Sequence, residues 1–201
     1  MTDESWTGGG ATALKTYAPG VLTTYDVLVS VRPSGVHDEM LESPAVTAFA
    51  EQFRVDASAI GDPVRAAFVR ATGTHTTAVA QMVWISDVAP RVRAALDAIF
   101  GPSPTWPGTR RYPVADPTVA VDGFLESVTR LVAAEHDESS DRPDAAGAAL
   151  GLADAMVRTP TAIPGSVVEA VHELLSPAEA VEVVLDSARR SADKIGVSLA
   201  A

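Results

Sequence analysis

The chain has 201 residues, no cysteine and a formal net charge of −11, from 26 acidic and 15 basic residues. The lack of cysteine excludes disulfides, thiolate metal sites, iron–sulfur clusters and cysteine nucleophiles, and the acidic excess argues against a nucleic-acid partner. No segment approaches the roughly 18 consecutive apolar residues of a membrane span and no secretory signal is visible, so we expect a cytoplasmic protein without a membrane partner.

Residues 1–42 are predicted to form an N-terminal arm with short elements, ahead of a single helical domain over residues 43–201. The first ten residues are rich in Gly, Thr and Ser, and we expect them to fray. In Leu22–Arg32 the valines alternate as in a strand, yet the chain offers no second convincing strand to pair with it. This segment is therefore predicted to be an extended arm or a short helix packed on a neighbour.

Several helix starts are marked by a polar residue followed by proline, and at Ser43-Pro44 the serine suits the N-cap and the proline the first helical position. These starts occur at Ser43-Pro44, Asp62-Pro63, Asp116-Pro117 and Ser176-Pro177. Glu179 completes a capping box with Ser176, and it opens the predicted last helix. Pro143 begins another helix that ends at Thr159-Pro160.

The central helix is predicted between Thr72 and Gly101. Apolar residues recur there at helical spacing, with Ser86 on the same stripe: Val79, Met82, Val83, Val88, Val92, Ala95, Leu96 and Ile99. Pro90 lies inside the pattern and predicts a kink near Ser86. The chain as a whole is predicted to be all-α, with about seven to eight helices.

A long irregular connection, rich in proline and glycine, follows the central helix over residues 102–117. Such a composition is typical of a surface loop. Trp106 is expected to anchor this loop by covering apolar surface.

Residues 45–69 and 82–101 resemble the N-terminal half of actinobacterial AhpD-like proteins, and residues 149–200 resemble the C-terminal half. These proteins belong to the carboxymuconolactone decarboxylase/alkylhydroperoxidase superfamily. The resemblance implies an AhpD-like helical bundle and a homo-oligomer, most simply a homodimer. Family members carry a Cys-x-x-Cys motif followed by His, with a Glu that assists proton transfer. Here the corresponding segment lacks both cysteines, so the resemblance implies the scaffold without thiol peroxidase activity.

Three residues are candidates for acid–base catalysis. His75 begins the central helix among threonine hydroxyls, and Glu135 with His136 occupies the position of the lost motif. Imidazole titrates near neutral pH and a carboxylate can assist it. The simpler interpretations, which we favour, are a helix-terminal residue bonding locally and a solvated acidic turn. No metal site or cofactor is predicted.

Trp84, Asp87 and Arg91 lie at spacings of three and four, so they can share a helix face. The three side chains are candidates for binding an anionic substrate, although a structural Asp87–Arg91 pair is the simpler interpretation. On the last helix, a charged face is expected to be solvated or to contact another subunit: Asp186, Arg189, Arg190, Asp193 and Lys194.

Two functions remain open from the sequence. The first is a cofactor-independent acid–base lyase or isomerase acting on a small, secondary-metabolic compound. The second is a non-catalytic relative that kept the fold for binding or assembly. A buried pocket that contains His75 or His136 with a second polar group would favour the enzyme.

Overall fold

The computed structural model describes residues 6–107, 117–135, 142–159 and 161–200. Within these ranges the chain is helical and contains no strand, so the predicted all-α fold is confirmed. The helices are α1 (Gly10–Tyr17), α2 (Pro19–Ser30), α3 (Asp38–Leu41), α4 (Pro44–Asp56), α5 (Asp62–Thr72), α6 (Thr76–Phe100), α7 (Pro117–Glu135), α8 (Pro143–Arg158), α9 (Gly165–Leu174), α10 (Pro177–Arg190) and α11 (Asp193–Leu199), with short 3-10 turns at Ala57–Ala59 and Gly73–His75.

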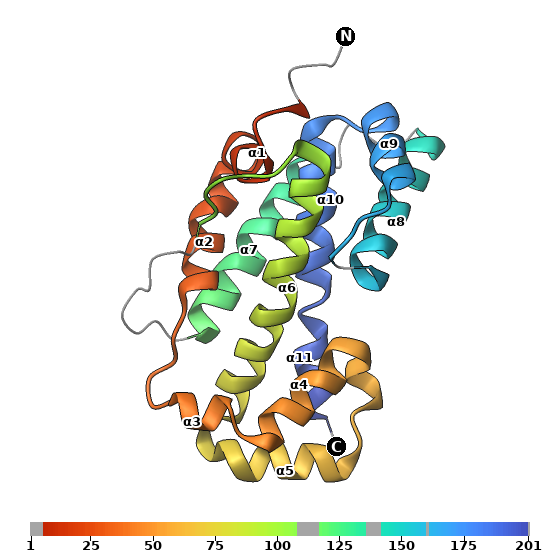
Figure 1. Cartoon of the computed structure of the whole chain (residues 1–201). Helices are drawn as coiled ribbons and strands as arrows, with labels where there is room; N and C mark the ends of the chain where they lie inside the picture. The colour runs from red at the N-terminus through yellow and green to blue at the C-terminus, as the bar shows by residue number, and fades with distance from the viewer. Residues whose placement is uncertain (1–5, 108–116, 136–141, 160, 201) are drawn as a thin grey trace.

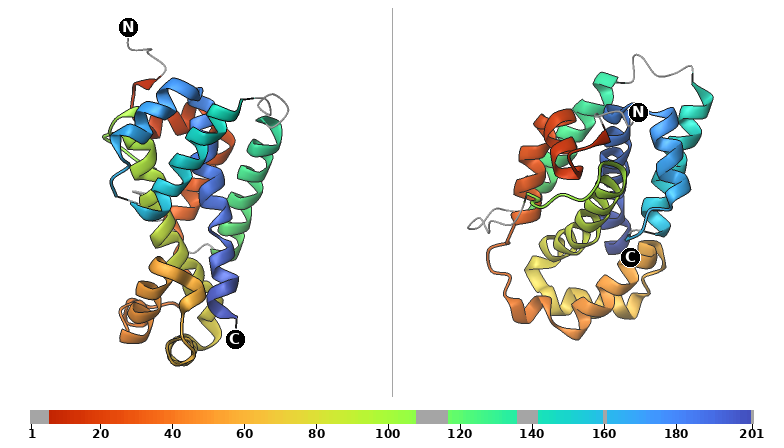
Figure 2. Two further views of the ribbon diagram at one scale, coloured as in Figure 1. Left: turned by 90° about the vertical axis from the view of Figure 1, so that its right-hand side faces the viewer. Right: turned by 45° about the horizontal axis from the view of Figure 1, so that its top comes forward.

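The long helix α6 is the axis of the bundle. It runs beside α10, with α1, α2 and α7 on one side and α8 and α9 on the other (Figures 1 and 2). Val79, Trp84 and Leu96 have no exposed surface, because neighbouring helices cover α6 along most of its length. The shorter helices α3, α4 and α5 lie across the end of the bundle where α6 begins.

One position on the predicted inward stripe of α6 differs from expectation. Ser86 is exposed, because α3 and α4 leave a hollow of about 310 Å³ over this part of the helix. Leu41, Val46 and Met82 line the same hollow. The helix continues through Pro90 as one α-helix of 25 residues. The kink that we predict near Ser86 stays a prediction.

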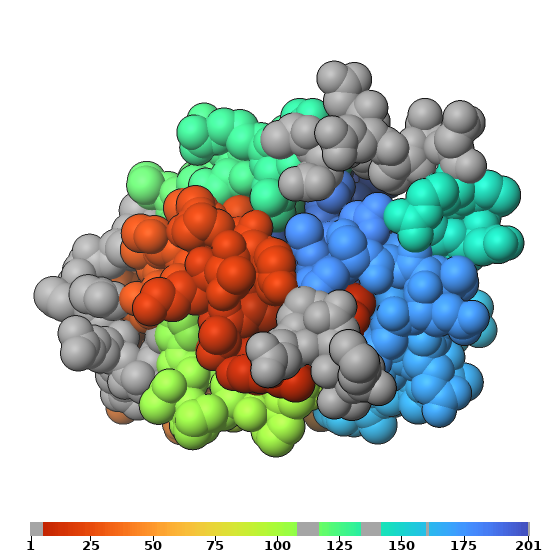
Figure 3. Space-filling model, turned by 90° about the horizontal axis from the view of Figure 1, so that it is seen from above, coloured from red at the N-terminus to blue at the C-terminus, as the bar shows by residue number. Residues whose placement is uncertain are grey.

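The segment before residue 43 forms helices that share the core. The backbone N–H groups of Gly9 and Gly10 donate to the carbonyls of Phe100 and Gly101 at 3.0 and 3.1 Å, which satisfies acceptors left free at the end of α6. Leu14 is fully buried. Of the two alternatives for residues 22–32, the packed helix is observed. Seen from above, these N-terminal residues (red and orange) lie between α7 (green) and the end of α6 (yellow-green) (Figure 3).

The predicted last helix is divided in two. The capping box at its start is confirmed: Ser176 Oγ accepts from the Glu179 N–H at 3.2 Å, and Glu179 Oε2 accepts from the Ser176 N–H at 2.6 Å. The helix α10 then ends at Arg190, and α11 begins at Asp193 after a turn at Ser191 and Ala192. The turn is a short break, and α11 continues from α10 toward α4 in Figure 1.

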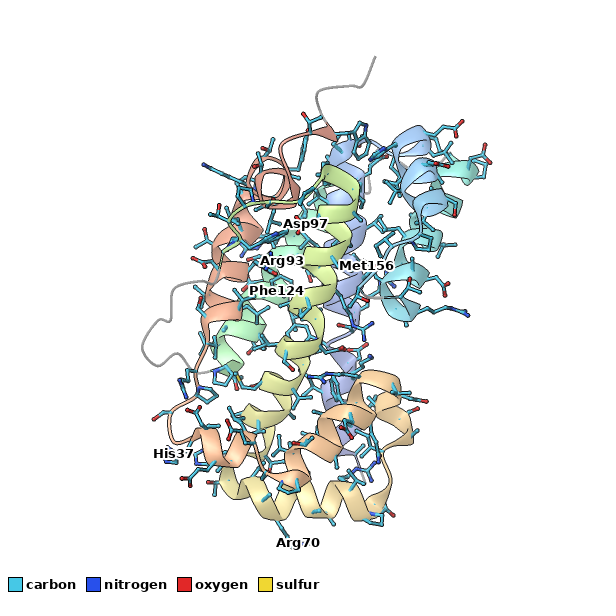
Figure 4. All side chains as sticks on the ribbon, viewed as in Figure 1. His37, Arg70, Arg93, Asp97, Phe124 and Met156 are labelled. Atoms are coloured by element: carbon cyan, nitrogen blue, oxygen red, sulfur yellow. The ribbon has the colours of Figure 1, made fainter. Side chains whose placement is uncertain are left out.

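Trp106 anchors the described start of the loop after α6, as predicted. Its ring is buried, and its Nε1–H donates to the Asp97 carboxylate at 3.1 and 3.2 Å. The Ser103 N–H donates to the same carboxylate at 3.1 Å. Asp97 and Arg93 extend from the side of α6 that faces α2 (Figure 4).

Candidate functional site

A buried ion pair lies on α6 at the level of α11. Arg91 donates from Nε and Nη2 to Asp87 Oδ1 at 3.0 and 2.8 Å, so the predicted i, i+4 pair is confirmed. Lys194 of α11 approaches the other carboxylate oxygen, with Nζ 3.7 Å from Asp87 Oδ2. The Asp87 side chain is only 7% exposed, so the low-dielectric surroundings strengthen its attraction to both cations. One carboxylate thus faces two cations.

The remaining donor of Arg91 joins α6 to α8. Its Nη1 donates to the carbonyls of Met156 and Val157, both at 2.9 Å, in the last turn of α8. These carbonyls have no partner inside their own helix, and a cation at a helix C-terminus is electrostatically favourable. Met156 lies on the side of α8 that faces α6 (Figure 4). The Arg91 guanidinium is therefore occupied by structural contacts.

Trp84 belongs to the core. Its ring is fully buried, with the Phe124 ring centroid 6.3 Å away, and its Nε1–H donates to Ser191 Oγ at 2.9 Å. A side chain without exposed surface offers no face to a ligand in this conformation. Trp84 instead fixes the turn between α10 and α11, and that turn positions Lys194.

A cleft lies beside this network, between the end of α4, the C-terminal part of α8 and the junction of α10 with α11. We call it the α4–α8–α11 cleft; its volume is about 490 Å³, within the usual range of ligand sites. Val55, Val157 and Val197 line it, and they are 87%, 67% and 45% exposed. Large apolar side chains with this exposure, gathered at one place, mark a candidate binding site.

The same cleft is lined by charged side chains of both signs. Arg54, Arg190 and Lys194 bring positive charge, and Asp56 and Asp193 bring negative charge. Hydrogen bonds from the Ser58 hydroxyl and the Ser58 N–H lower the pKa of Asp56. This carboxylate is therefore ionised at neutral pH and already has two donors.

Arg190 is also held within its own helix. Its Nε donates to Asp186 Oδ2 at 2.6 Å, and Arg189 donates to the other oxygen of the same carboxylate. Partial burial tends to raise the pKa of Asp186, but the bonds from Arg190 and Arg189 outweigh it and lower the pKa. The charged face predicted on the last helix is thus an ordered ion-pair cluster that borders the cleft.

The structure describes the position of two of the three catalytic candidates, His75 and the backbone of Glu135. His75 packs against the loop before α3, where a Cβ on Gly35 would lie 2.8 Å from His75 Cε1. Glu135 ends α7, and His136 lies outside the described residues. The start of α7 lies beside the start of α6, because the Thr118 hydroxyl of α7 donates to Gln81 Oε1 of α6. A helix of 19 residues is roughly 28 Å long, so the other end of α7, at Glu135, lies at the opposite end of the bundle from His75.

The residues that sequence reasoning missed are those brought together from distant helices. The sequence predicts Lys194 on a face that is solvated or contacts another subunit, yet in the structure its side chain is only 29% exposed and bridges to α6. The rim valines belong to α4, α8 and α11, so no local spacing connects them. Within the described residues, no group of three or more His, Asp or Glu side chains is placed to hold a metal ion, and no helix is long and apolar enough to cross a bilayer.

The fold and the cleft together define an all-α protein with a surface cleft that is lined by both apolar and charged side chains. The chain belongs to the same family as an uncharacterized protein of Mycobacterium tuberculosis, which matches in strains CDC 1551/Oshkosh and H37Rv. The chain is 31% identical to this relative over an alignment of 212 positions, and the alignment covers 80% of the chain and 74% of the relative. No family model matches the chain, and no solved structure matches it significantly.

Proposed function

We propose that this protein binds a small, largely apolar molecule in the α4–α8–α11 cleft and does not transform it. The observation that carries the proposal is the gathering of Val55, Val157 and Val197 around one open cleft of about 490 Å³. Burying exposed aliphatic surface favours binding by about 25 cal/mol per Å² before the costs of association. In this proposal the AhpD-like bundle is a scaffold retained for binding.

Catalysis by a lyase or isomerase is the other function expected from the sequence. It requires a general acid or base within hydrogen-bond reach of the substrate. His75 does not line the cleft, and α7 ends at Glu135 at the opposite end of the bundle from His75. The placement of these residues favours binding over acid–base catalysis.

The test uses a neutral solvatochromic dye, Nile red, titrated into the purified full chain. We expect saturable fluorescence enhancement that weakens severalfold when Val157 is replaced by Gln, because the polar amide would lose apolar contact with the dye. Val119→Gln is the matched control, since Val119 on α7 is similarly exposed, at 69%, and does not line the cleft. Equal binding by both variants, or no saturable binding, would contradict the proposal.

A further inference from the structure

We propose that the ligand of the α4–α8–α11 cleft is a linear aliphatic carboxylate, bound through its anionic end by Lys194 and through its chain by the rim valines. This inference rests on the proposed function and specifies the chemical class of the ligand. It follows from the unused donors of Lys194, from the carboxylates that attract Lys194 without bonding to it, and from the composition of the apolar lining.

The ammonium group of Lys194 has unused donors. Its Nζ lies 3.7 Å from Asp87 Oδ2, an ion pair longer than a direct hydrogen bond, and 5.7 Å from the centroid of the Phe53 ring. Among the described residues, no acceptor lies within hydrogen-bond distance of Nζ. A lysine ammonium has three N–H donors, and its side chain here lines the cleft. Lys194 can therefore donate to a bound anion without giving up a hydrogen bond.

Among the described residues, carboxylates attract Lys194 without forming a hydrogen bond to its ammonium group. Asp87 is shared with Arg91, whose two bonds to Oδ1 are much shorter than the Lys194 contact. Asp56, which also lines the cleft, attracts Lys194 electrostatically, but its Oδ1 already accepts two hydrogen bonds from Ser58, and Asp193 is exposed at the start of α11. An anionic ligand would supply a counter-charge in direct contact with Lys194, in a partly buried place where screening by solvent is weaker.

The apolar part of the lining suits an aliphatic chain. The described residues around the cleft include alanine and valine side chains but no aromatic ring. A planar ligand would therefore find no stacking partner, whereas a flexible methylene chain can lie along the branched valine side chains. The ligand should be of small to medium size, because the cleft has a volume of about 490 Å³. Octanoate combines this chain with a single carboxylate and is the probe that we choose.

The first experiment observes Lys194 directly. The chain contains two lysines, Lys15 and Lys194, so protein labelled with ¹³C at the lysine ε-carbon gives two side-chain signals. We expect octanoate to shift the Lys194 signal in a saturable manner and to leave Lys15, exposed on α1, unchanged. Octanol, which has the same chain length without the charge, should shift the Lys194 signal much less.

The second experiment measures affinity by displacement of Nile red. Lys194→Met keeps an apolar stem of similar length and should weaken octanoate binding about tenfold or more, while octanol binding stays within about twofold. Lys15→Met is the matched control and should change neither. Equal shifts by octanoate and octanol, or octanoate affinity unchanged in Lys194→Met, would overturn the carboxylate inference and leave binding of an apolar ligand intact. No displacement by either probe, with no Nile red binding, would overturn the proposed function itself.

Discussion

At the scale of single residues, burial decides how much an ion pair contributes to the stability of the fold. Asp87–Arg91 and Asp154–Arg158 have the same i, i+4 spacing and nearly equal lengths, 2.8 and 2.7 Å. Their surroundings differ: the side chains of the first pair are 7% and 13% exposed, and those of the second are 57% and 75% exposed. Solvent screens the second pair and leaves its side chains mobile, whereas the first pair is held by contacts from α8 and α11.

This contrast gives a prediction about stability. Replacing Asp87 by Asn should lower the free energy of unfolding by about 3 kcal/mol or more, because Arg91 and Lys194 would be left partly buried without a counter-charge. Asp154→Asn should change it by less than about 0.5 kcal/mol. Urea unfolding followed by circular dichroism measures both. Similar small losses for the two variants would mean that the Asp87 network does not hold α6, α8 and α11 together.

At the scale of elements, α1 packs closely on α6 because Gly10 has no side chain. A Cβ on Gly10 would lie 2.7 Å from the backbone carbonyl carbon of Leu96 and 2.8 Å from its Cβ. The first of these neighbours is backbone and cannot move aside without shifting a helix. The glycine therefore permits the close contact that places α1 beside the last turns of α6.

Gly10→Ala should destabilise the protein by about 1–3 kcal/mol, since the methyl group would push α1 away from α6. Gly147→Ala in α8 is the matched control, because a Cβ there meets nothing within 4 Å. That control should stabilise the protein by up to about 1 kcal/mol through the better helix propensity of alanine. Thermal and urea unfolding of the two variants should move in opposite directions, and a neutral Gly10→Ala would contradict the close packing.

At the scale of the whole molecule, the composition excludes the thiol chemistry of AhpD-like peroxidases. Reduction of a peroxide by thiolate attack needs one nucleophilic sulfur and a second to resolve the sulfenic acid as a disulfide. The chain has no cysteine, and its sulfur is confined to four methionines, Met1, Met40, Met82 and Met156. A thioether can be oxidised to a sulfoxide but forms no resolving disulfide.

We therefore predict no alkylhydroperoxidase turnover. The measurement is a coupled assay with metal-stripped protein, an organic hydroperoxide and a dithiol reductant. The expected rate equals that of the protein-free control, because any methionine oxidation would stop after one event per site. Sustained turnover above that rate would show that the scaffold supports peroxide chemistry by a route without thiols.

The sequence by itself determined the helical class, the main helix starts and the excluded chemistry. These properties are local or compositional: the capping box at Ser176 and Glu179 acts within one turn, the apolar stripe of α6 repeats every three to four residues, and a missing cysteine needs no fold to be recognised. The Asp87–Arg91 pair was predictable for the same reason, since both residues lie on one helix.

Only the tertiary structure decided where the candidate binding site lies. Trp84 and Ser191 are 107 positions apart, and their hydrogen bond sets the turn that brings Lys194 to Asp87. Helical periodicity shows which face of each helix is apolar, but not which neighbour leaves part of that face uncovered. Ser86 is exposed in the hollow between α6 and the helices α3 and α4, and Val157 lines the α4–α8–α11 cleft. Both openings lie between helices that are distant in the chain. Such gaps arise from packing among several elements, so the spacing of apolar residues along the sequence does not predict them.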